Sequence, residues 1–393
     1  VFCCGIEGSE AQHAEALEDL VLGVIEQVSQ EGVPQARLEA VLHQLELHQR
    51  EISGDSYPYG LQLILQALGC ATHYSDPIAV LNLEPVIARL QEQIQNPDYI
   101  RHLARQLLLE NEHRVTLVMT PDTTLSAKNL ALETARLADI KTAMSESQRK
   151  ATIKLASDLS ARQEQVDDDS VLPRVELSDV PAALPDLTFE KTRPHGVPFT
   201  TYGQGTNGLV YQQAIAPLPP LGDSALRLLP LYSSILTEVG LGDESYLEVQ
   251  QRQAATIGSI SAFTAMRGTV DNEQSISANF TLSSKALLRN APAQTQLMFD
   301  TLHNVRFNET GRIRELVSQM RARRDQSVTG NGHSLAMAAA CAGMSPLAKL
   351  QHEQSGLAGI RQLRTLDDSL ADEETLKTFA EQLGALHGEL LST

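Results

Sequence analysis

The chain has 393 residues, 42% of them hydrophobic, which is enough apolar sequence for two domains that each bury a core. Its formal net charge of -18 disfavours nucleic acid as a partner; the charge either attracts cationic partners or serves solubility alone. No apolar run is long enough to span a bilayer, and the charge also repels anionic lipid, so no membrane partner is expected.

Four cysteines are scattered along the chain, at Cys3, Cys4, Cys70 and Cys341. Without Cys-x-x-Cys spacing they predict neither a disulfide framework nor a structural zinc site. The opening residues 1–6 form an apolar, strand-like run with no polar lead-in. This predicts that they belong to the interior of a domain and that the natural N-terminus lies elsewhere.

The first part of the chain is predicted to hold helices between two strands. The strand-like runs are 1–6 and 113–119. Apolar residues recur at helical spacing between them, and Gly and Pro residues separate the helices. The helical stretches are Leu17 to Val28, a helix beginning near Gln35, and residues 57–70, 78–94 and 98–109.

Residues 126–165 are polar, alanine-rich and nearly free of glycine, and two helical patterns meet there near Met144 and Ser145. Ser145 is suited to cap the second helix, so we predict a helical hairpin. Residues 157–186 hold eight acidic residues against two basic ones, with three prolines. Such a segment buries little apolar surface, which predicts an extended linker.

A second unit is predicted from Leu187 onward. Strands followed by helical runs, occurring twice in the chain, predict an α+β fold rather than a doubly wound sheet. The predicted elements are strands at 197–202 and 208–216, a helix at 222–239, strands near 257–266 and 275–283, and helices to the end.

The run Gly203-Gln204-Gly205-Thr206-Asn207-Gly208 matches the dinucleotide fingerprint Gly-x-Gly-x-x-Gly. That mechanism needs a helix N-terminus after the glycines to hold a pyrophosphate. Here the strand-like residues 209–211 follow. We therefore predict a turn between antiparallel strands.

The eleven histidines include no pair three or four residues apart, the spacing that places two imidazoles on one helix face. Residues 43–47 and 48–52 each begin as half of a zinc motif, His-x-x-Glu, but end in Leu and Ile. His43 and His48 are five residues apart and so point in different directions. We interpret both segments as a polar, solvated helix face rather than a metal site.

A local basic patch is predicted on a helix near the C-terminus. It is either a solvated face or a site for a carboxylate. Its members are Arg312, Arg314, Arg321, Arg323 and Arg324. The sequence has no nucleophile elbow, phosphate loop or EF-hand spacing, and no Trp to stack on bases, so nucleotide and nucleophilic chemistry are not expected.

Several short stretches, taken together in their order, resemble the presequence proteases, a branch of the pitrilysin/insulinase-type zinc metallopeptidases. Those of the first half are Gln49-Arg50-Glu51, 56–61 (SYPYGL), 111–116 (NEHRVT) and Pro121-Asp122. Those of the second half are Leu172-Pro173, 177–181 (LSDVP), 206–211 (TNGLVY), 229–232 (LPLY) and 330–333 (GNGH).

The resemblance implies a fold of two clam-shell α/β layers joined by a long helical hairpin. In that family the two halves enclose an unfolded peptide for cleavage by zinc. Residues 1–122 would be the C-terminal part of the second domain, 123–186 the hairpin and acidic linker, and 187–393 a truncated, catalytically degenerate third domain. The chain would then be an internal piece of a metalloendopeptidase, with unfolded peptides and the rest of its own polypeptide as partners.

The family's zinc helix carries His-x-x-Glu-His, which supplies two ligands and a base that activates water. Counting back from Gly240 on the predicted helix 222–239 aligns Leu231, Ser234 and Ile235 with these three positions. Ligands and base are all replaced. The resemblance therefore implies that zinc belongs to another part of the parent peptidase and that this chain alone binds none and is inactive.

Ser261-Ala262-Phe263-Thr264 resembles the family's Asn-Ala-Phe-Thr strand, whose edge pairs with substrate, with Ser261 in place of the asparagine. The family's substrate-clamping Arg and Tyr are expected beyond Thr393. Two other interpretations stay open: an inactive scaffold or partner subunit of the same fold, and, more distantly, an unrelated helical interaction protein. A His-x-x-Glu-His motif in the parent reading frame would favour the peptidase over the scaffold.

Overall fold

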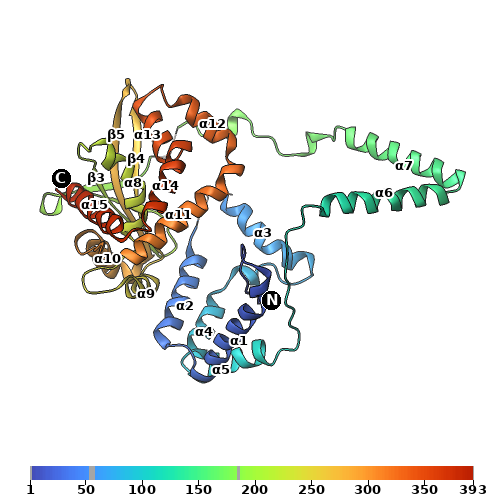
Figure 1. Cartoon of the computed structure of the whole chain (residues 1–393), viewed down its shortest axis with the longest axis horizontal. Helices are drawn as coiled ribbons and strands as arrows, with labels where there is room; N and C mark the ends of the chain where they lie inside the picture. The colour runs from blue at the N-terminus through green and yellow to red at the C-terminus, as the bar shows by residue number, and fades with distance from the viewer. Residues whose placement is uncertain (1, 53–57, 184–185, 393) are drawn as a thin grey trace. The chain divides into compact units, whose positions relative to one another are not determined.

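The structure is a computed structural model that describes residues 2–52, 58–183 and 186–392 (Figure 1). Helices dominate, and the strands form a two-stranded and a three-stranded sheet, both antiparallel, so the predicted α+β class is confirmed. The chain divides into two compact units. The smaller unit comprises Val1–Ile25 and Leu109–Gln204, and the larger unit comprises Glu26–Leu108 and Gly205–Thr393.

The smaller unit contains two long helices and a short hairpin. The helices are α6 (Leu125–Ala143) and α7 (Glu146–Glu164), and the hairpin pairs β1 (Phe189–Thr192) with β2 (Phe199–Tyr202). The unit also takes the first part of α1 (Ala14–Glu31). Strand β2 confirms the predicted strand at 197–202, whereas β1 was missed.

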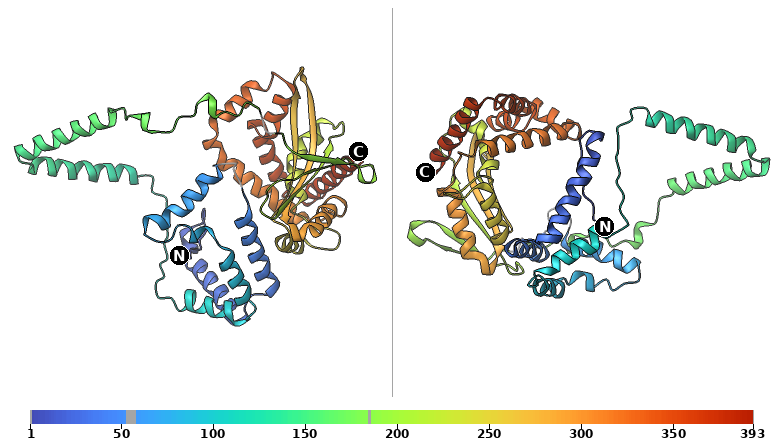
Figure 2. Two further views of the ribbon diagram at one scale, coloured as in Figure 1. Left: turned by 180° about the vertical axis from the view of Figure 1, so that it is seen from behind. Right: turned by 60° about the horizontal axis from the view of Figure 1, so that its bottom comes forward.

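The two helices predicted on either side of Met144 are confirmed, and they run in opposite directions from their junction (Figure 1, Figure 2). Ser145 caps α7 as predicted: its Oγ accepts from the Gln148 N–H at 3.3 Å, and Oε1 of Gln148 accepts from the Ser145 N–H at 2.9 Å. Every residue of both helices is exposed, so neither buries surface against the other. A packed hairpin remains a prediction.

The predicted strands at 1–6 and 113–119 are wrong. Residues 2–6 and 113–119 are irregular, and Val115, Leu117 and Met119 are 88%, 77% and 85% exposed. A strand needs a neighbour that pairs with its N–H and C=O groups, and no residue within the described ranges pairs with these two runs. High β-propensity does not create a strand without such a neighbour.

The acidic segment 157–186 begins later than predicted. Helix α7 continues to Glu164 because its residues still follow the helical pattern, so the irregular stretch starts at Gln165. From there to residue 183 the backbone holds two short 3₁₀ turns, Asp169–Val171 and Leu177–Asp179, and every side chain is exposed. The remainder of the segment agrees with an extended linker.

In the larger unit, four helices confirm the helical stretches predicted before residue 110. They are α2 (Gln35–Arg50), α3 (Tyr59–Thr72), α4 (Glu84–Gln93) and α5 (Asp98–Ala104), followed by a π-helical turn at Arg105–Leu109. Gly32 ends α1 with a φ of +80°, a left-handed conformation that favours glycine. The start of the predicted helix 57–70, and residues 56–57 of the presequence-protease-like stretch, lie outside the described residues or at their border.

The larger unit also holds a sheet in the order β3-β5-β4. Its strands are β3 (Leu209–Pro217), β4 (Ser259–Thr269) and β5 (Asn272–Leu287), and they confirm the predicted strands. Helix α8 (Asp223–Leu236) lies between β3 and β4 in the sequence, as predicted. The remaining helices are α9 (Tyr246–Thr256), α10 (Ala291–His303), α11 (Thr310–Gly330), α12 (Gly332–Cys341), α13 (Pro346–Gln354), α14 (Leu357–Ser369) and α15 (Glu373–Leu391).

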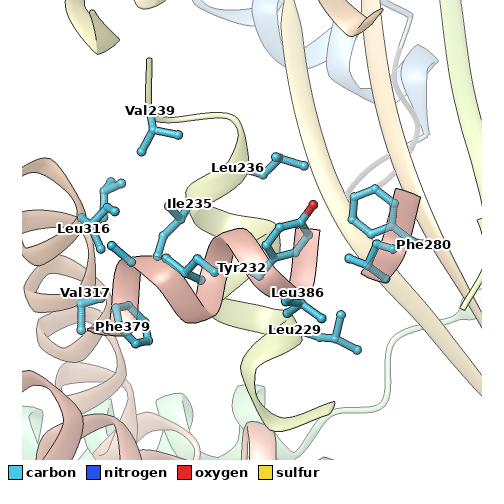
Figure 3. Packing of buried hydrophobic residues seen from close by; sticks show 14 of the residues in the cluster. Leu229, Tyr232, Ile235, Leu236, Val239, Phe280, Leu316, Val317, Phe379 and Leu386 are labelled. Atoms are coloured by element: carbon cyan, nitrogen blue, oxygen red, sulfur yellow. The ribbon is translucent and has the colours of Figure 1, made fainter. Parts of the chain in front are cut away.

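The main hydrophobic core surrounds α8. Its buried residues Tyr232, Ile235 and Leu236 contact β5 through Phe280 on one side and α11 and α15 on the other (Figure 3). Residues of β5 alternate between the two faces of the sheet, so Phe280 and Leu282 share the face that meets α8. Burial of this alternating set holds α8 at a defined position against the sheet.

The glycine run forms a tight turn, as predicted, but it is not a hairpin. Asn207 and Gly208 have φ of 52° and 80°, the conformation that an Asn-Gly pair adopts in a type I′ turn. The turn connects β2 to β3, which belong to different sheets. Nδ2 of Asn207 donates to the Arg50 carbonyl at 3.1 Å, so this turn also satisfies the C-terminal end of α2.

We predict that residues 165–183 are the first site of proteolysis, because they are exposed, irregular and acidic. Brief digestion with a protease that cuts after acidic residues should leave fragments near 1–165 and 187–393. The fragments should stay together on gel filtration, because α2 and the sheet belong to one compact unit. First cuts inside α8, or separation of the fragments, would contradict the described fold.

We also predict a sharp difference between two leucines of neighbouring sequence. Leu282 on β5 is 0% exposed, and Leu288 just beyond β5 is 65% exposed. Leu282→Ala should lower the free energy of unfolding by about 2–5 kcal/mol, because it leaves a cavity in the core. Leu288→Ala should change it by no more than about 0.5 kcal/mol. Urea denaturation followed by circular dichroism measures both, and equal losses would refute the assigned core.

Candidate functional site

Helix α8 carries the three residues aligned with a zinc motif. Leu231 is half-buried, Ser234 is exposed, and Ile235 is fully buried in the core. The Oγ of Ser234 donates to the Pro230 carbonyl at 2.9 Å, within the same helix. Zinc takes thiolate, imidazole or carboxylate donors, and two of these side chains are hydrocarbons. The residues at the three positions do not fit a zinc ion.

A cavity of about 840 Å³ lies beside α8, and Leu231 and Ser234 are part of its wall. Its other lining residues come mainly from α11, α13, α14 and α15. Phe379 and Leu386 of α15 line it and are also members of the buried core, so the cavity reaches the core. The volume lies within the range of about 300–1,000 Å³ typical of ligand pockets.

Charged side chains of both signs line this cavity. The bases are Arg227, Arg323 and Arg324, and the acids are Glu353 and Glu389. Glu353 forms ion pairs with Arg227 at 3.4 Å and with Lys349 at 3.9 Å. This pairing leaves two adjacent arginines of α11 facing a single acid, Glu389.

The predicted basic patch divides into three groups. Arg312 is nearly buried: it binds Glu238 at 2.9 Å and lies 4.7 Å from the ring of Tyr246. Arg321 binds Asp367 and Asp368 at 2.8 and 2.6 Å. Arg314 is exposed and does not line the cavity, whereas Arg323 and Arg324 do. Most of the patch therefore stabilises the fold, and two members face a cavity.

Strand β4 contains the predicted peptide-edge segment Ser261–Thr264. It lies at an edge of its sheet, paired with β5 in the register Ser261↔Ser283 to Thr264↔Phe280. Ser261 and Phe263 are exposed, whereas Ala262 and Thr264 are half-buried against the core. Within the described residues no strand pairs with the other side of β4, which leaves that edge geometrically able to accept an extended chain.

The interpretation of α2 as a solvated helix face is wrong for its first half-motif. His43, Glu46 and Leu47 are buried, while His48 is exposed. Nδ1 of His43 donates to the Ala254 carbonyl at 3.0 Å, and Nε2 accepts from Nδ2 of Asn290 at 3.1 Å. The helix face that carries His43 packs on α9 and the end of β5, which no local pattern of charges reveals.

Glu46 lies at the centre of an ionic network. Arg289 donates to both of its carboxylate oxygens, at 2.9 and 2.6 Å, and Nε of Arg50 adds a third contact at 3.0 Å. The hydrogen bond from Arg289 is the main cause that holds the pKa of Glu46 below its ordinary value. A few residues further along α2, Lys285 of β5 pairs with Glu51.

Sequence reasoning missed the partners of this network. Arg289, Asn290 and Lys285 lie more than two hundred positions from α2 in the chain, and no motif connects them to it. It also missed the cavity, whose residues are spread over five helices. In the part of the chain that the structure describes, no group of three or more His, Cys, Asp or Glu residues is placed to hold a metal ion. No helix among the described residues is both long and apolar enough to cross a membrane.

Comparison with known sequences identifies the family. A family model for the associated region of the subfamily C peptidases of family M16 matches residues 119–366, which is more than half of the chain, so the chain belongs to that family. Within it the chain is of the presequence-protease type, and the predicted resemblance is confirmed.

Three curated relatives illustrate the match. The mitochondrial presequence protease of Xenopus tropicalis is 27% identical over 366 residues, which cover 93% of this chain and 35% of that protein. Presequence protease 1, chloroplastic/mitochondrial, of Arabidopsis thaliana is 25% identical over 95% of this chain and 35% of that protein. The mitochondrial presequence protease of Mus musculus is 25% identical, with coverage of 93% and 35%. The chain thus spans about a third of the length of these relatives.

We predict that protonation of His43 destabilises the larger unit. Burial foremost, and the nearby Arg289, hold the pKa of His43 below its ordinary value. The unfolded chain therefore binds a proton more readily, so stability falls as the pH drops below about 6.5. The slope from this group is at most about 1.4 kcal/mol per pH unit. Burial likewise lowers the pKa of His387, which adds to the same window.

The test compares His43→Gln with His48→Gln in urea denaturation between pH 7 and pH 5, the window set by the ordinary histidine pKa of about 6.5. His43→Gln should flatten the pH dependence in part and leave the contribution of His387. His48→Gln should leave it unchanged, because His48 is exposed. If both variants keep the parent slope, the role assigned to His43 is incorrect.

Proposed function

We propose that this chain is a non-catalytic segment of a zinc metalloendopeptidase that degrades unfolded peptides inside a closed chamber. The observation that carries the proposal is the state of α8: Leu231, Ser234 and Ile235 stand where a zinc helix would hold its ligands and base, yet none of them fits zinc. Its membership of a peptidase family supports the same conclusion. The zinc site would belong to another part of the parent protein.

The structural role we assign is that of a chamber wall and hinge. Residues 1–122 form the end of the second metallopeptidase-like domain, 123–186 the hairpin and linker, and 187–393 the third domain. The exposed, irregular residues 165–183 suit a hinge, and the sheet with its covering helices suits a wall. A wall contributes by excluding folded proteins and by holding an extended peptide near the zinc, which favours productive alignment.

The edge of β4 is the element of this wall that suits peptide pairing. An extended peptide that adds to an open strand edge gains main-chain hydrogen bonds whatever its sequence, and alternate side-chain contacts supply selectivity. In this role Ser261 and Phe263 would contact the peptide, since both are exposed on β4. The alternative to this whole proposal is an inactive scaffold or partner subunit of the same fold.

The experiment compares this chain with its parent protein. The purified 393-residue chain should hold no stoichiometric zinc by elemental analysis and should cleave no peptide. The parent protein should hold one zinc and should cleave an unfolded peptide much faster than the same sequence within a folded domain. A tightly held zinc in the chain alone, abolished by His43→Ala or His48→Ala, would overturn the assignment. A zinc-free, inactive parent would favour the scaffold.

A further inference from the structure

We propose that the cavity beside α8 binds the C-terminal residue of an unfolded peptide. The terminal carboxylate would lie at Arg323 and Arg324, and the side chain of the same residue would lie against the apolar wall. The inference deepens the proposed function and rests on it in one respect, namely that the ligands of this protein are peptides. It assigns a binding site and a ligand class to the wall.

The apolar part of the site is built from core residues. Leu231 of α8, Met320 of α11, and Phe379 and Leu386 of α15 all line the cavity and belong to, or pack on, the main hydrophobic core. Because the core holds these side chains in place, the wall needs little rearrangement to receive an apolar group. A cavity of about 840 Å³ has room for one large side chain and the adjoining backbone.

The charged part of the site is the pair of adjacent arginines. Both are exposed and both line the cavity, and neither makes an ion pair with another described residue. Their neighbour Arg321, by contrast, is held by Asp367 and Asp368. Two guanidinium groups opposite the single acid Glu389 form a local positive region in a chain whose net charge is -18. Such a region selects a carboxylate, which arginine binds with two parallel hydrogen bonds.

The C-terminal residue of a peptide matches this combination better than an internal acidic residue. It carries a carboxylate and a side chain on one Cα, so a single residue reaches both parts of the cavity. An internal Asp or Glu uses its side chain for the charge and must place a second residue against the apolar wall. The amide nitrogens and oxygens of Gln354, Gln362 and Gln382, which also line the cavity, are suited to the peptide backbone.

The test measures binding of labelled, unfolded peptides to the 393-residue chain by fluorescence anisotropy. One peptide ends in leucine with a free carboxylate, the second is the same peptide amidated, and the third is amidated with an internal Glu-Leu pair. The free carboxylate should improve affinity about tenfold over the amide, as charged hydrogen bonds typically do. Equal affinity for the first two peptides, or binding of the third as tightly as the first, would overturn the proposal.

Two sets of variants locate the site. Arg323→Ala with Arg324→Ala should abolish the preference for the free carboxylate, whereas Arg267→Ala with Arg314→Ala should keep it, because these arginines are equally exposed but lie outside the cavity. Ser234→Trp should weaken all binding by filling the cavity from an exposed position. Loss of the preference in the control pair alone would refute the site. These measurements require no cleavage, so a failed peptidase assay of the parent protein leaves their outcome interpretable.

Discussion

The burial of α8 is the interaction on which the rest of the structure depends. Leu229, Tyr232, Ile235 and Leu236 are at most 1% exposed, and they join the sheet to α11 and α15 (Figure 3). Each fully buried side chain of this kind contributes about 1.5–3 kcal/mol. The hydroxyl of Tyr232 stays hydrogen-bonded, with Nδ1 of His387 at 2.7 Å, so the polar group is buried without the cost of an unsatisfied partner.

The same packing explains why this helix has no catalytic chemistry. A zinc ligand at Ile235 would require a polar, metal-bound side chain where the structure has its fully buried core. The neighbouring positions Leu231 and Ser234 border a cavity instead. One face of α8 therefore stabilises the fold, and the remaining lining positions contribute shape and polarity to a binding surface rather than a reaction centre.

A second, polar joint ties α2 to the sheet. Glu46 accepts two hydrogen bonds from Arg289, Asn290 binds His43, and Leu47 packs on Leu209 and Leu287. Removing one partner from such a buried ionic network is strongly destabilising, because it leaves a charge without compensation. Motion within the larger unit that separated α2 from β5 would have to break this joint, so the irregular residues 165–183 are the better place for a hinge.

The sequence by itself determined the helices, most of the strands, the α+β class and the family, because local periodicity, turn residues and ordered motifs act over short distances. It determined equally that α8 lacks zinc ligands. Only the tertiary structure decided that His43 is buried, that residues 113–119 form no strand, and which two of five arginines face a cavity. Burial, strand pairing and ion pairing join residues far apart in the chain, such as Glu46 and Arg289, and no local pattern encodes which distant partner a side chain meets.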